Sequence, residues 1–598
     1  MRRDQAVIFA SVLAVAAVYI FTLGHTAVGT LGDSLEVVAA ASVWGVPHAP
    51  GYPLYMSLCH VFTKFPLLSD AGAVHLLHAL ILAASAGFIA HLVLKETESP
   101  IAAWTGAAMF AFSRYVWLKG VSADALTLNV LFAVALLALI NSEKPRSALA
   151  AAFLFGLAFS HHQTVVLALP ALALRLSRRS GWRDPAFVGR CAAISIFGLI
   201  IGYVLVYPRA LAGPPVSWGG VSDFEGLRRL FTRADFGGMG SISDAALGGA
   251  VLTPAKRMIN VQLFFTTAWA YFTPAGIGLA LWGLASAVRR RTALGGPLLA
   301  WLLVAGPIYL YYLGLPPSRA SDQSHVYRFF LLPHAAIGIA IGLGAARLLE
   351  IASRGRLWAA IALIALPLWP LAQHANAVSR RGVGISERYL MDLVRFTPEN
   401  SILLISGDAN YFGCDYIEHS LGRMGGRVCV DPKKTSFPWY AKQVSARPNG
   451  FPIPTGPNGK LHFRNLKVLI SAALKTDRPV FILGDYLRRR PEILDGFFFH
   501  PGGLLMRVAL KPPTTSRSVL AQSTEQLWTL GHAPQASTDN ALEGSAELIL
   551  SKSYAIQLTK LALFRQGLGD EAGARRLHLR ARLLYAGRLP GLRPLPKN

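Results

Sequence analysis

GAVHLLHALILAASAGFIAHLVL, residues 72–94, contains no aspartate, glutamate, lysine or arginine. A helix of this length can cross the hydrocarbon of a bilayer, which takes about 20 apolar residues. The stretch is one of ten such apolar runs, at 6–24, 72–94, 101–118, 125–140, 148–174, 190–206, 259–287, 294–314, 329–349 and 357–373. The sequence therefore predicts a polytopic α-helical membrane protein with roughly 10–12 spans in residues 1–373. The first run lacks a small-residue cleavage site and is expected to be a retained span.

The composition of the 598 residues agrees with this class. The chain is 53% hydrophobic and 15% charged, with a mean hydropathy of +0.41, whereas soluble proteins carry about 25% charged residues. A net charge of +26 could indicate nucleic-acid binding, but no basic-aromatic motif accompanies it. In a polytopic chain, Lys and Arg gather in cytoplasmic loops and beside anionic lipids. We therefore expect membrane lipids as partners and no nucleic acid. The four cysteines have no metal-ligand spacing, and no metal is expected.

Basic clusters predict which side of the membrane each loop faces. They fall at 2–3, 144–146, 175–183, 289–291 and 347–356, and the positive-inside rule makes all of them cytoplasmic. The run 148–174 must then enter and leave on one side, as two short helices that meet near Ser160-His161-His162. On this topology the loops 207–257 and 315–328 are extracytoplasmic, in an integral membrane protein of the bacterial inner membrane.

Two acids, Asp33 and Glu36, open the first of these extracytoplasmic loops. Asp-Ser-Leu-Glu has the form of a capping box, with Asp33 as N-cap and Glu36 at N3. It predicts a short interfacial helix that stops near Gly45. The same carboxylates lie where a lipid headgroup and an aqueous acceptor could meet, which fits catalysis. The residues alone leave both interpretations open.

Four motifs in order carry a family resemblance: Gly32-Asp33-Ser34-x-Glu36 with His48-x-Pro50-Gly51-Tyr52-Pro53; Val116-Trp117 with Asp124-Ala125-Leu126-Thr127-Leu128-Asn129; Gly156-Leu157 with Ser160-His161-His162-Gln163-Thr164; and Trp218-Gly219 with Thr232-Arg233-x-x-Phe236-Gly237. Together they resemble transmembrane O-mannosyltransferases, known in animals for modifying plexin-type receptors, with many bacterial homologues of unassigned function. The likeness covers about residues 25–240 well. Asp124 and Leu126 stand where the family usually has Glu and Tyr, and Ser217-Trp218-Gly219-Gly220 stands where it has Asn-Trp-Gly-Asp.

The resemblance implies an inverting glycosyltransferase of the polytopic GT-C class. Such an enzyme takes a sugar such as mannose from a polyprenyl-phosphate carrier and needs no cofactor. By similarity Asp33 would be the general base, and Glu36 would orient the acceptor or keep Asp33 ionised through water. The phosphate leaving group calls for cations and hydrogen-bond donors. The substrate-binding candidates are His48, Tyr52, Asp124, His161, His162, Trp218, Arg233 and Arg328.

Plainer interpretations exist for several of these residues and for the whole protein. His161 and His162 could cap a helix turn, Arg328 could anchor a span at the headgroups, and Arg233 could be a solvated loop residue. Serine or threonine of a protein is the expected acceptor, with a lipid or polysaccharide as the alternative. A flippase or transporter for a lipid-linked substrate is the competing class.

The composition changes after about residue 374, where long apolar runs stop. Strands are expected at 401–405, 427–430, 480–483 and 504–509, in an extracytoplasmic α/β domain over 374–515 that helps to present the acceptor. Gly-Asp follows two of these strands and predicts Asp408 and Asp485 as N-caps. Cys414 and Cys429 could form a disulfide there. Residues 516–598 are expected to be helical, with helices at 540–568 and 570–587, the last lying on anionic headgroups.

Overall fold

A computed structural model describes residues 3–27, 33–144, 146–178, 183–238, 253–313, 325–461, 465–484, 486, 495–531 and 546–585. The chain divides into two compact units. The membrane unit comprises Met1–His25 and Ala40–Gly382, and the C-terminal unit comprises Thr26–Ala39 and Val383–Asn598. The first-loop segment Thr26–Ala39 is thus grouped with the far end of the chain, which no sequence pattern had indicated.

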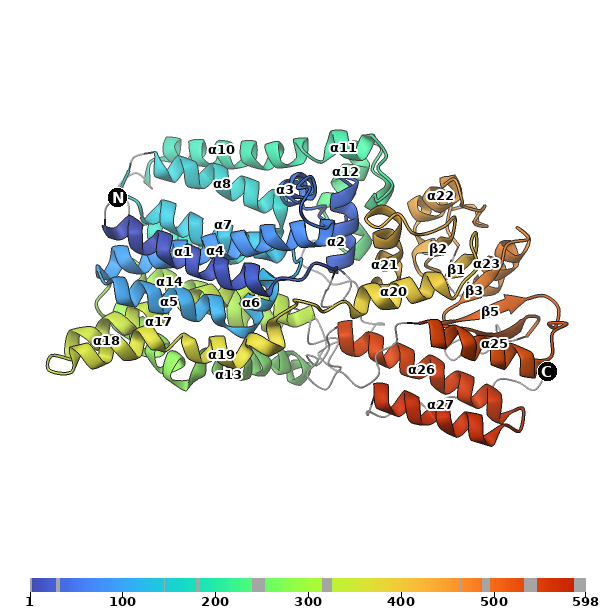
Figure 1. Ribbon diagram of the computed structural model, residues 1–598. Coiled ribbons are helices and arrows are strands. Elements are labelled where there is room, and N and C mark those ends of the chain that lie inside the picture. Colours follow the sequence, from blue (N-terminus) through green and yellow to red (C-terminus); the bar gives the residue numbers. More distant parts are fainter. Residues whose placement is uncertain are drawn as a thin grey trace. The chain divides into compact units, whose positions relative to one another are not determined.

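Helices make up the membrane unit (Figure 1). They are α1 (Arg3–Thr22), α3 (Pro53–Thr63), α4 (Asp70–Thr97), α5 (Pro100–Phe112), α6 (Arg114–Gly120), α7 (Leu126–Asn141), α8 (Ser147–His161), η1 (Gln163–Ala168), α9 (Leu169–Leu176), α10 (Pro185–Val204), α11 (Tyr207–Leu211), η3 (Trp218–Gly220), α12 (Phe224–Phe231), η4 (Ala234–Phe236), α13 (Pro254–Arg289), α14 (Gly295–Leu303), η5 (Val304–Ile308), α15 (Tyr309–Tyr312), η6 (Arg328–Phe330), α17 (Leu331–Ile351), α18 (Arg356–Ala365) and α19 (Leu368–Val378). The helix α2 (Asp33–Ser42) begins in the C-terminal unit and ends in the membrane unit.

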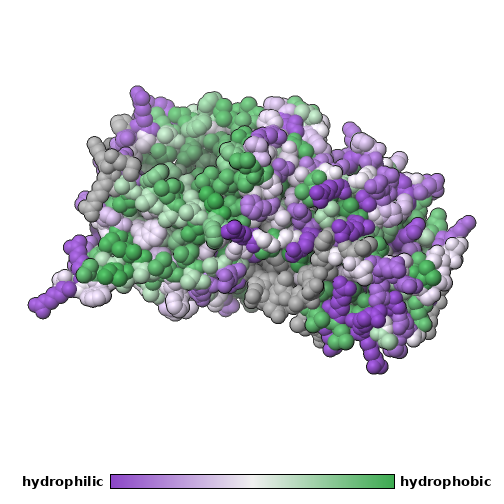
Figure 2. Space-filling view, viewed as in Figure 1, coloured by the Kyte–Doolittle hydropathy of each residue, from purple (hydrophilic) through white to green (hydrophobic). Residues whose placement is uncertain are grey.

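Seven helical segments among the described residues are long and apolar enough to cross a membrane. They are Asp4–Thr22, Asp70–Thr97, Pro185–Leu211, Pro254–Arg289, Gly295–Tyr312, His325–Ile351 and Arg356–Val378, and five shorter apolar helices accompany them. Figure 2 shows hydrophobic surface concentrated over the helices of this unit. The predicted polytopic helical fold is confirmed.

The core of the membrane unit forms around α17. In the segment His325–Ile351, which contains this helix, 94% of the most apolar stretch is buried. Small residues let its neighbours come close, because a Cβ at Gly106 in α5 would lie 2.6 Å from the Gly338 carbonyl oxygen of α17. Glycine at such a crossing allows backbone-to-backbone packing, which drives helix association where lipid is as apolar as the side chains.

The run 148–174 is broken where the sequence predicted. The helix α8 ends at His161, His162 adopts an extended conformation (φ −156°, ψ 129°), and η1 then continues into α9. The two short helices are confirmed, and the side of the membrane that their ends face stays a prediction.

A five-stranded sheet of order β2-β1-β3-β5-β4 forms the centre of the C-terminal unit. The strand β1 (Ile402–Leu404) is parallel to β2 (Val428–Val430) and β3 (Val480–Ile482), while β5 (Leu505–Ala509) is antiparallel to β3 and to β4 (Phe498–Gly502). Four of these strands were predicted. The fifth, β4, was missed because Pro501 and Gly502 break the apolar pattern at the tight connection to β5.

Helices surround this sheet: α20 (Ile385–Arg395), α21 (Asp408–His419), η7 (Lys434–Ser436), α22 (Pro438–Ala446), α23 (Leu466–Leu474), α25 (Arg517–Leu530), α26 (Ala546–Gln566) and α27 (Glu571–Leu584). The predicted disulfide is present, with the Cα atoms of Cys414 and Cys429 6.4 Å apart. The prediction of Asp408 as N-cap is wrong, because Gly407 occupies that position and Asp408 is the first helical residue. The other predicted cap, Asp485, lies outside the described residues.

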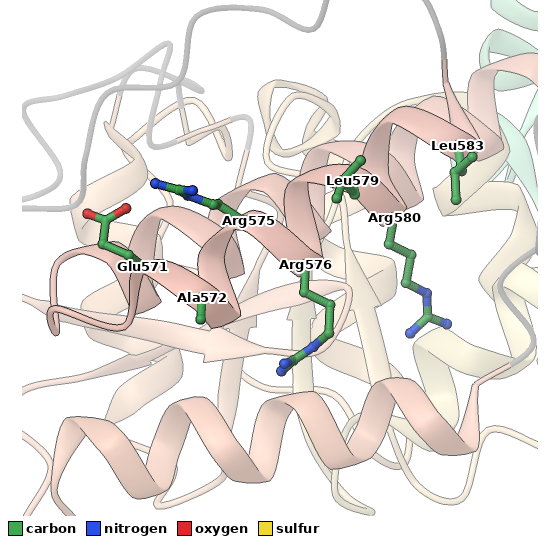
Figure 3. A pocket seen from close by; sticks show the side chains of 7 residues that line it. All are labelled: Glu571, Ala572, Arg575, Arg576, Leu579, Arg580 and Leu583. Atoms are coloured by element: carbon green, nitrogen blue, oxygen red, sulfur yellow. The ribbon is translucent and has the colours of Figure 1, made fainter.

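The last helix, α27, has two different faces. The buried face packs against α26 through Gly573, Ala574, Leu577, Ala581 and Leu584. Figure 3 shows side chains that line a shallow pocket on the opposite face, namely Glu571, Ala572, Arg575, Arg576, Leu579, Arg580 and Leu583. Two exposed leucines between arginines are the pattern of an interfacial helix, and contact with anionic headgroups stays a prediction.

Candidate active site

A buried ion cluster forms around Asp124, in the short connection between α6 and α7. One carboxylate oxygen, Oδ2, lies 2.7 Å from Lys119 Nζ, and the other, Oδ1, lies 3.3 Å from an Arg328 nitrogen. The Leu126 backbone N–H also donates to Oδ1, at 3.0 Å. Burial by itself would raise the pKa of Asp124, but the Arg328 and Lys119 charges outweigh it and hold this pKa below its usual range. The carboxylate is therefore ionised at neutral pH and orients two cations.

Tyr52 lies at the centre of an aromatic and histidine cluster. Its hydroxyl is 2.9 Å from His48 Nε2, and its ring stacks on His162 with the ring centroids 6.0 Å apart and an interplanar angle of 6°. The His161 ring is 5.6 Å away from it. Four of the predicted substrate-binding residues, from two separate segments, are thus brought together.

The two neighbouring histidines present different atoms. His162 Nδ1 accepts from the Thr164 backbone N–H at 3.2 Å, so in the neutral ring Nε2 carries the proton. Asn129 donates to the Thr164 hydroxyl at 2.8 Å, which fixes this arrangement. In this form the ring offers its Nε2 proton as a hydrogen-bond donor. His161 donates from Nε2 to the Ala125 carbonyl at 2.9 Å, and its buried Nδ1 has no hydrogen-bond partner among the described residues.

The first loop is fastened to the loop that contains Trp218. The Val46 N–H donates to the Val216 carbonyl and the Trp218 N–H donates to the Val46 carbonyl, both at 2.8 Å. Gly51 has φ +85°, and a Cβ there would lie 2.9 Å from a Leu230 methyl. This position therefore requires glycine, for its backbone conformation and for space.

Trp218 and Arg233 complete the same region of the membrane unit. The Trp218 indole N–H donates to Asp235 at 3.1 Å, and its ring stacks on Phe236 at 5.6 Å. The Arg233 guanidinium carbon lies 5.6 Å from the Phe236 ring centroid. The His48 ring meets the Trp218 and Phe236 rings edge-on, with ring centroids 6.3 and 6.1 Å apart. The loop after α11 thus supplies a flat aromatic surface beside the histidines, a surface of the kind that can pack against a sugar ring.

The two candidate acids belong to the C-terminal unit. Asp33 is the first residue of α2 and half-buried, whereas Glu36, one turn later, is only 1% exposed. The same unit holds a buried cation, Lys434, which is 7% exposed. The helix ends at Ser42, and the Gly45 N–H bonds to the Ala40 carbonyl, so the predicted short helix is confirmed. The prediction of Asp33 as its N-cap is wrong by one residue, because Asp33 is the first helical residue.

Sequence reasoning missed several side chains that hold these groups. Tyr55 and His78 are bonded at 2.8 Å, and the Asp124 N–H donates to the same His78 Nε2 at 3.0 Å. Lys119 was also missed. The available signal was an ionisable residue inside an apolar run, as with His78 in α4, or directly after one, as with Lys119 in α6, because such residues at membrane depth are rare without a partner or function.

A groove of about 440 Å³ lies beside this region on the membrane unit. Its lining is almost wholly apolar and comes from α10, α11 and α12: Leu199, Ile200, Tyr203, Val204, Tyr207, Pro208, Phe224, Leu227, Arg228 and Phe231. Phe231 and Tyr203 also pack on each other and, with Trp218, on the core cluster that includes Val46 and Ala49. The groove therefore has its wall in common with the first loop.

Comparison with known proteins gives consistent matches. Residues 33–184 match the sequence model of the protein O-mannosyl-transferase TMEM260 N-terminal domain. The protein O-mannosyl-transferase TMEM260 of Mus musculus is 27% identical over 477 residues, which are 76% of this chain and 66% of the relative. The protein of that name from Dictyostelium discoideum is 24% identical over 345 residues, 52% of this chain and 41% of the relative. The chain spans slightly less than two thirds of the mouse protein's length and about two fifths of the other.

Proposed function

We propose that this chain, which belongs to the TMEM260 family of protein O-mannosyl-transferases, transfers a sugar such as mannose from a polyprenyl-phosphate carrier to an acceptor hydroxyl. The acceptor is serine or threonine of a protein outside the cytoplasm. The donor, the acceptor and the catalytic base are parts of this proposal.

One observation carries the proposal beyond family membership. Donors and cations from distant parts of the sequence gather in the membrane unit: Arg233 and His48 both lie against the Phe236 ring, and Arg328 is held by Asp124. A sugar phosphate that leaves as an anion needs such groups. The neutral His162 has its Nε2 proton available as a donor, and the aromatic surface of Trp218 offers a place for the sugar.

In the proposed transfer step, the first-loop acids supply the general base and a group that orients the acceptor. Asp33 takes the proton of the acceptor hydroxyl while the hydroxyl oxygen bonds to the anomeric carbon from the face opposite the phosphate. The bond from that carbon to the phosphate oxygen breaks, the electron pair stays on the phosphate, and the configuration inverts. Glu36 lies one helical turn from Asp33 on the same face of α2 and orients the acceptor.

Two further features support the carrier and the compartment. The apolar groove lined by α10, α11 and α12 is suited to an isoprenoid chain, and Arg228 is among its lining residues. The Cys414–Cys429 disulfide suits an oxidising, extracytoplasmic compartment.

The test is sugar transfer by the purified full chain in nanodiscs. Radiolabelled polyprenyl-phosphate mannose is supplied with an extracytoplasmic protein fraction, and the label is followed into protein. Asp33→Asn is expected to lower turnover by about 10²–10⁴-fold. The matched control is Asp223→Asn, because Asp223 caps α12 through the Gly226 N–H, and asparagine caps equally well.

The outcomes separate the competing functions. If the label appears in a lipid or polysaccharide instead of protein, the acceptor is that lipid or polysaccharide. Movement of the carrier across the bilayer without any glycosyl product would make the protein a transporter. Near-normal turnover of a folded Asp33→Asn protein would leave this carboxylate a purely structural role at the start of α2.

A further inference from the structure

A single cation interrupts the apolar run 101–118 of the membrane unit. Arg114 is the first residue of α6, is half-buried, and has no carboxylate partner among the residues that the structure describes. Its Nε is enclosed and lacks a hydrogen-bond partner within the same part of the chain. A charge at membrane depth is costly without a partner and is a mark of functional sites. Arg114 therefore lacks a counter-ion that an anionic ligand would supply.

Aromatic side chains that can donate hydrogen bonds lie beside this guanidinium group. The Arg114 guanidinium carbon is 6.0 Å from the Tyr271 ring centroid. Tyr271 stacks on Tyr115 with the ring centroids 6.0 Å apart, and it meets the His374 ring edge-on at 5.8 Å. His374 is 4% exposed, and its Nε2 has no hydrogen-bond partner in the described residues. A cation and three neutral donors thus come together from α6, α13 and α19.

The helix α13 is broken at this cluster. Thr273, two residues after Tyr271, has φ +64° and ψ 156°, and Pro274 follows it. A β-branched residue rarely adopts a positive φ, and strained positions of this kind gather at functional sites. The Thr273 hydroxyl accepts from the Gly276 N–H at 3.2 Å, so it caps a second helical segment that begins at Pro274. The positive end of the dipole of that segment lies at the bend, where it favours an anion.

We propose that Arg114, Tyr115, Tyr271 and His374 form a binding site for the phosphate group of a lipid. The planar fork of an arginine matches phosphate oxygens in a bidentate manner. The two phenol hydroxyls and the imidazole supply further, neutral donors. The phosphate belongs to a lipid because the cluster is built by apolar helices of the membrane unit, where a lipid can bring its phosphate together with its hydrocarbon chain.

This site goes beyond the proposed transfer step and does not rest on it. None of its four side chains is among the candidates for substrate binding. One link to those candidates is Tyr327, which precedes Arg328 in the sequence and whose ring centroid is 4.5 Å from that of Tyr115. Two lipids carry the required phosphate, a membrane phospholipid and the polyprenyl-phosphate carrier. The first would be a bound structural lipid, and the second would extend the donor site along α6.

Structural roles for Arg114 would give different results. Arginine side chains near helix ends reach towards the headgroups without selecting a lipid. In that case the affinity for a soluble lipid phosphate would not depend on Arg114. If the guanidinium group instead pairs with an acid of the chain, its removal would lower stability even without any lipid phosphate.

The test is binding of two soluble probes to the purified full chain in a non-ionic detergent without phosphate. The probes are citronellyl phosphate, a short isoprenoid phosphate, and dihexanoyl phosphatidylglycerol, a short phospholipid. Binding raises the unfolding temperature, which a thiol-reactive dye at the buried Cys59 reports in a Cys191→Ala background. The variant is Arg114→Met. Arg190→Met is the matched control, because the Arg190 guanidinium carbon also lies 6.0 Å from a ring centroid, that of Phe187.

We expect Arg114→Met to weaken the binding of one probe at least about tenfold, since hydrogen bonds to charged groups are the stronger ones. Arg190→Met should bind like wild type. Weaker binding of citronellyl phosphate identifies the carrier as the ligand, and weaker binding of the phosphatidylglycerol identifies a phospholipid. Equal affinity of wild type and Arg114→Met for both probes would overturn the proposal.

Stability without a probe gives an independent check. Arg114→Met removes an unpaired charge, so it should unfold at the wild-type temperature or above it. A lower unfolding temperature would mean that the arginine already has its partner within the chain, and it would also overturn the proposal.

Tyr271→Phe tests the same site without changing its charge. The variant loses one hydroxyl and keeps the ring, so the same probe should bind about two- to tenfold more weakly. Tyr312→Phe, at an exposed tyrosine, should bind like wild type. Unchanged binding in Tyr271→Phe would refute the site. All of these are binding measurements, so a protein without transferase activity would refute the proposed function and leave their results valid.

Discussion

Replacing Asp124 with asparagine tests the ion cluster most directly. The side chain of Asp124 is 3% exposed and that of Lys119 is 4% exposed, so their 2.7 Å contact is almost dry. Removing one partner of such a pair leaves an uncompensated buried charge, at a cost of about 3–5 kcal/mol. Asparagine can still accept from the Leu126 N–H, and Arg328, with 17% of its side chain exposed, can regain some water. We therefore expect a loss near the lower limit, about 3 kcal/mol.

The assay is thermal unfolding reported by a buried thiol. Cys59 in α3 is free and buried, while Cys191 is half-exposed and is first replaced by alanine. A thiol-reactive dye then reports the opening of the membrane unit as the temperature rises. The expected change in Tm for Asp124→Asn is a fall on the order of 5 °C.

A second variant and a pH series make the result decisive. Lys119→Met/Asp124→Asn removes both members of the dry pair and should regain most of the lost stability. The folded-state pKa of Asp124 is below its usual value, so its contribution is lost only as the pH falls through that lowered pKa. The difference between wild type and Asp124→Asn should therefore be constant from about pH 8 to about pH 5. Wild-type Tm in Asp124→Asn, or a double variant less stable than the single one, would refute the reasoning.

Three further predictions concern topology, the first loop and the C-terminal unit. Single cysteines in place of Asp223 and Asn449 should react with an impermeant reagent in spheroplasts before lysis. Asn449 is used because a Cβ at Gly450 would clash with the Val444 carbonyl. Labelling only after lysis would contradict the predicted extracytoplasmic location of these two positions. Gly51→Ala should lower stability in the thiol assay by about 1–2 kcal/mol, because φ is +85° there, whereas Gly189→Ala, with open space around it, should not; equal Tm values would contradict this. Cys414→Ala should cost about 3 kcal/mol, the loop-closure value for a separation of 15 residues, measured by thermal unfolding against Cys191→Ala, and a reductant should abolish the difference.

Local patterns predicted much of this molecule. Apolar runs of spanning length become the long helices, and the polar Ser160-His161-His162 interruption becomes the break between α8 and η1. The strands β1, β2, β3 and β5 follow from short β-branched runs between turn residues. Each of these signals lies within a few residues of the structure that it predicts.

Pairings between distant residues could not be predicted in this way. Arg328 meets Asp124 across 204 positions of sequence, and neither periodicity nor composition specifies the partner of a single charge. Lys119, only five residues before Asp124, was missed because it directly follows the apolar run 101–118, where one charge changes no pattern. The grouping of Thr26–Ala39 with the C-terminal unit is likewise a matter of tertiary packing, and its capping-box pattern would be the same in any surroundings.

That grouping sets an order of events during synthesis. The segment Thr26–Ala39 is among the first to leave the ribosome, but the rest of its unit begins only at Val383. At about 5–20 residues per second, the segment waits on the order of tens of seconds for its partners. Until then Leu35, Val37 and Val38, which are buried in the finished protein, have no C-terminal unit to pack into. A chain that stalls after its last membrane helix would thus leave this apolar turn exposed to chaperones and proteases.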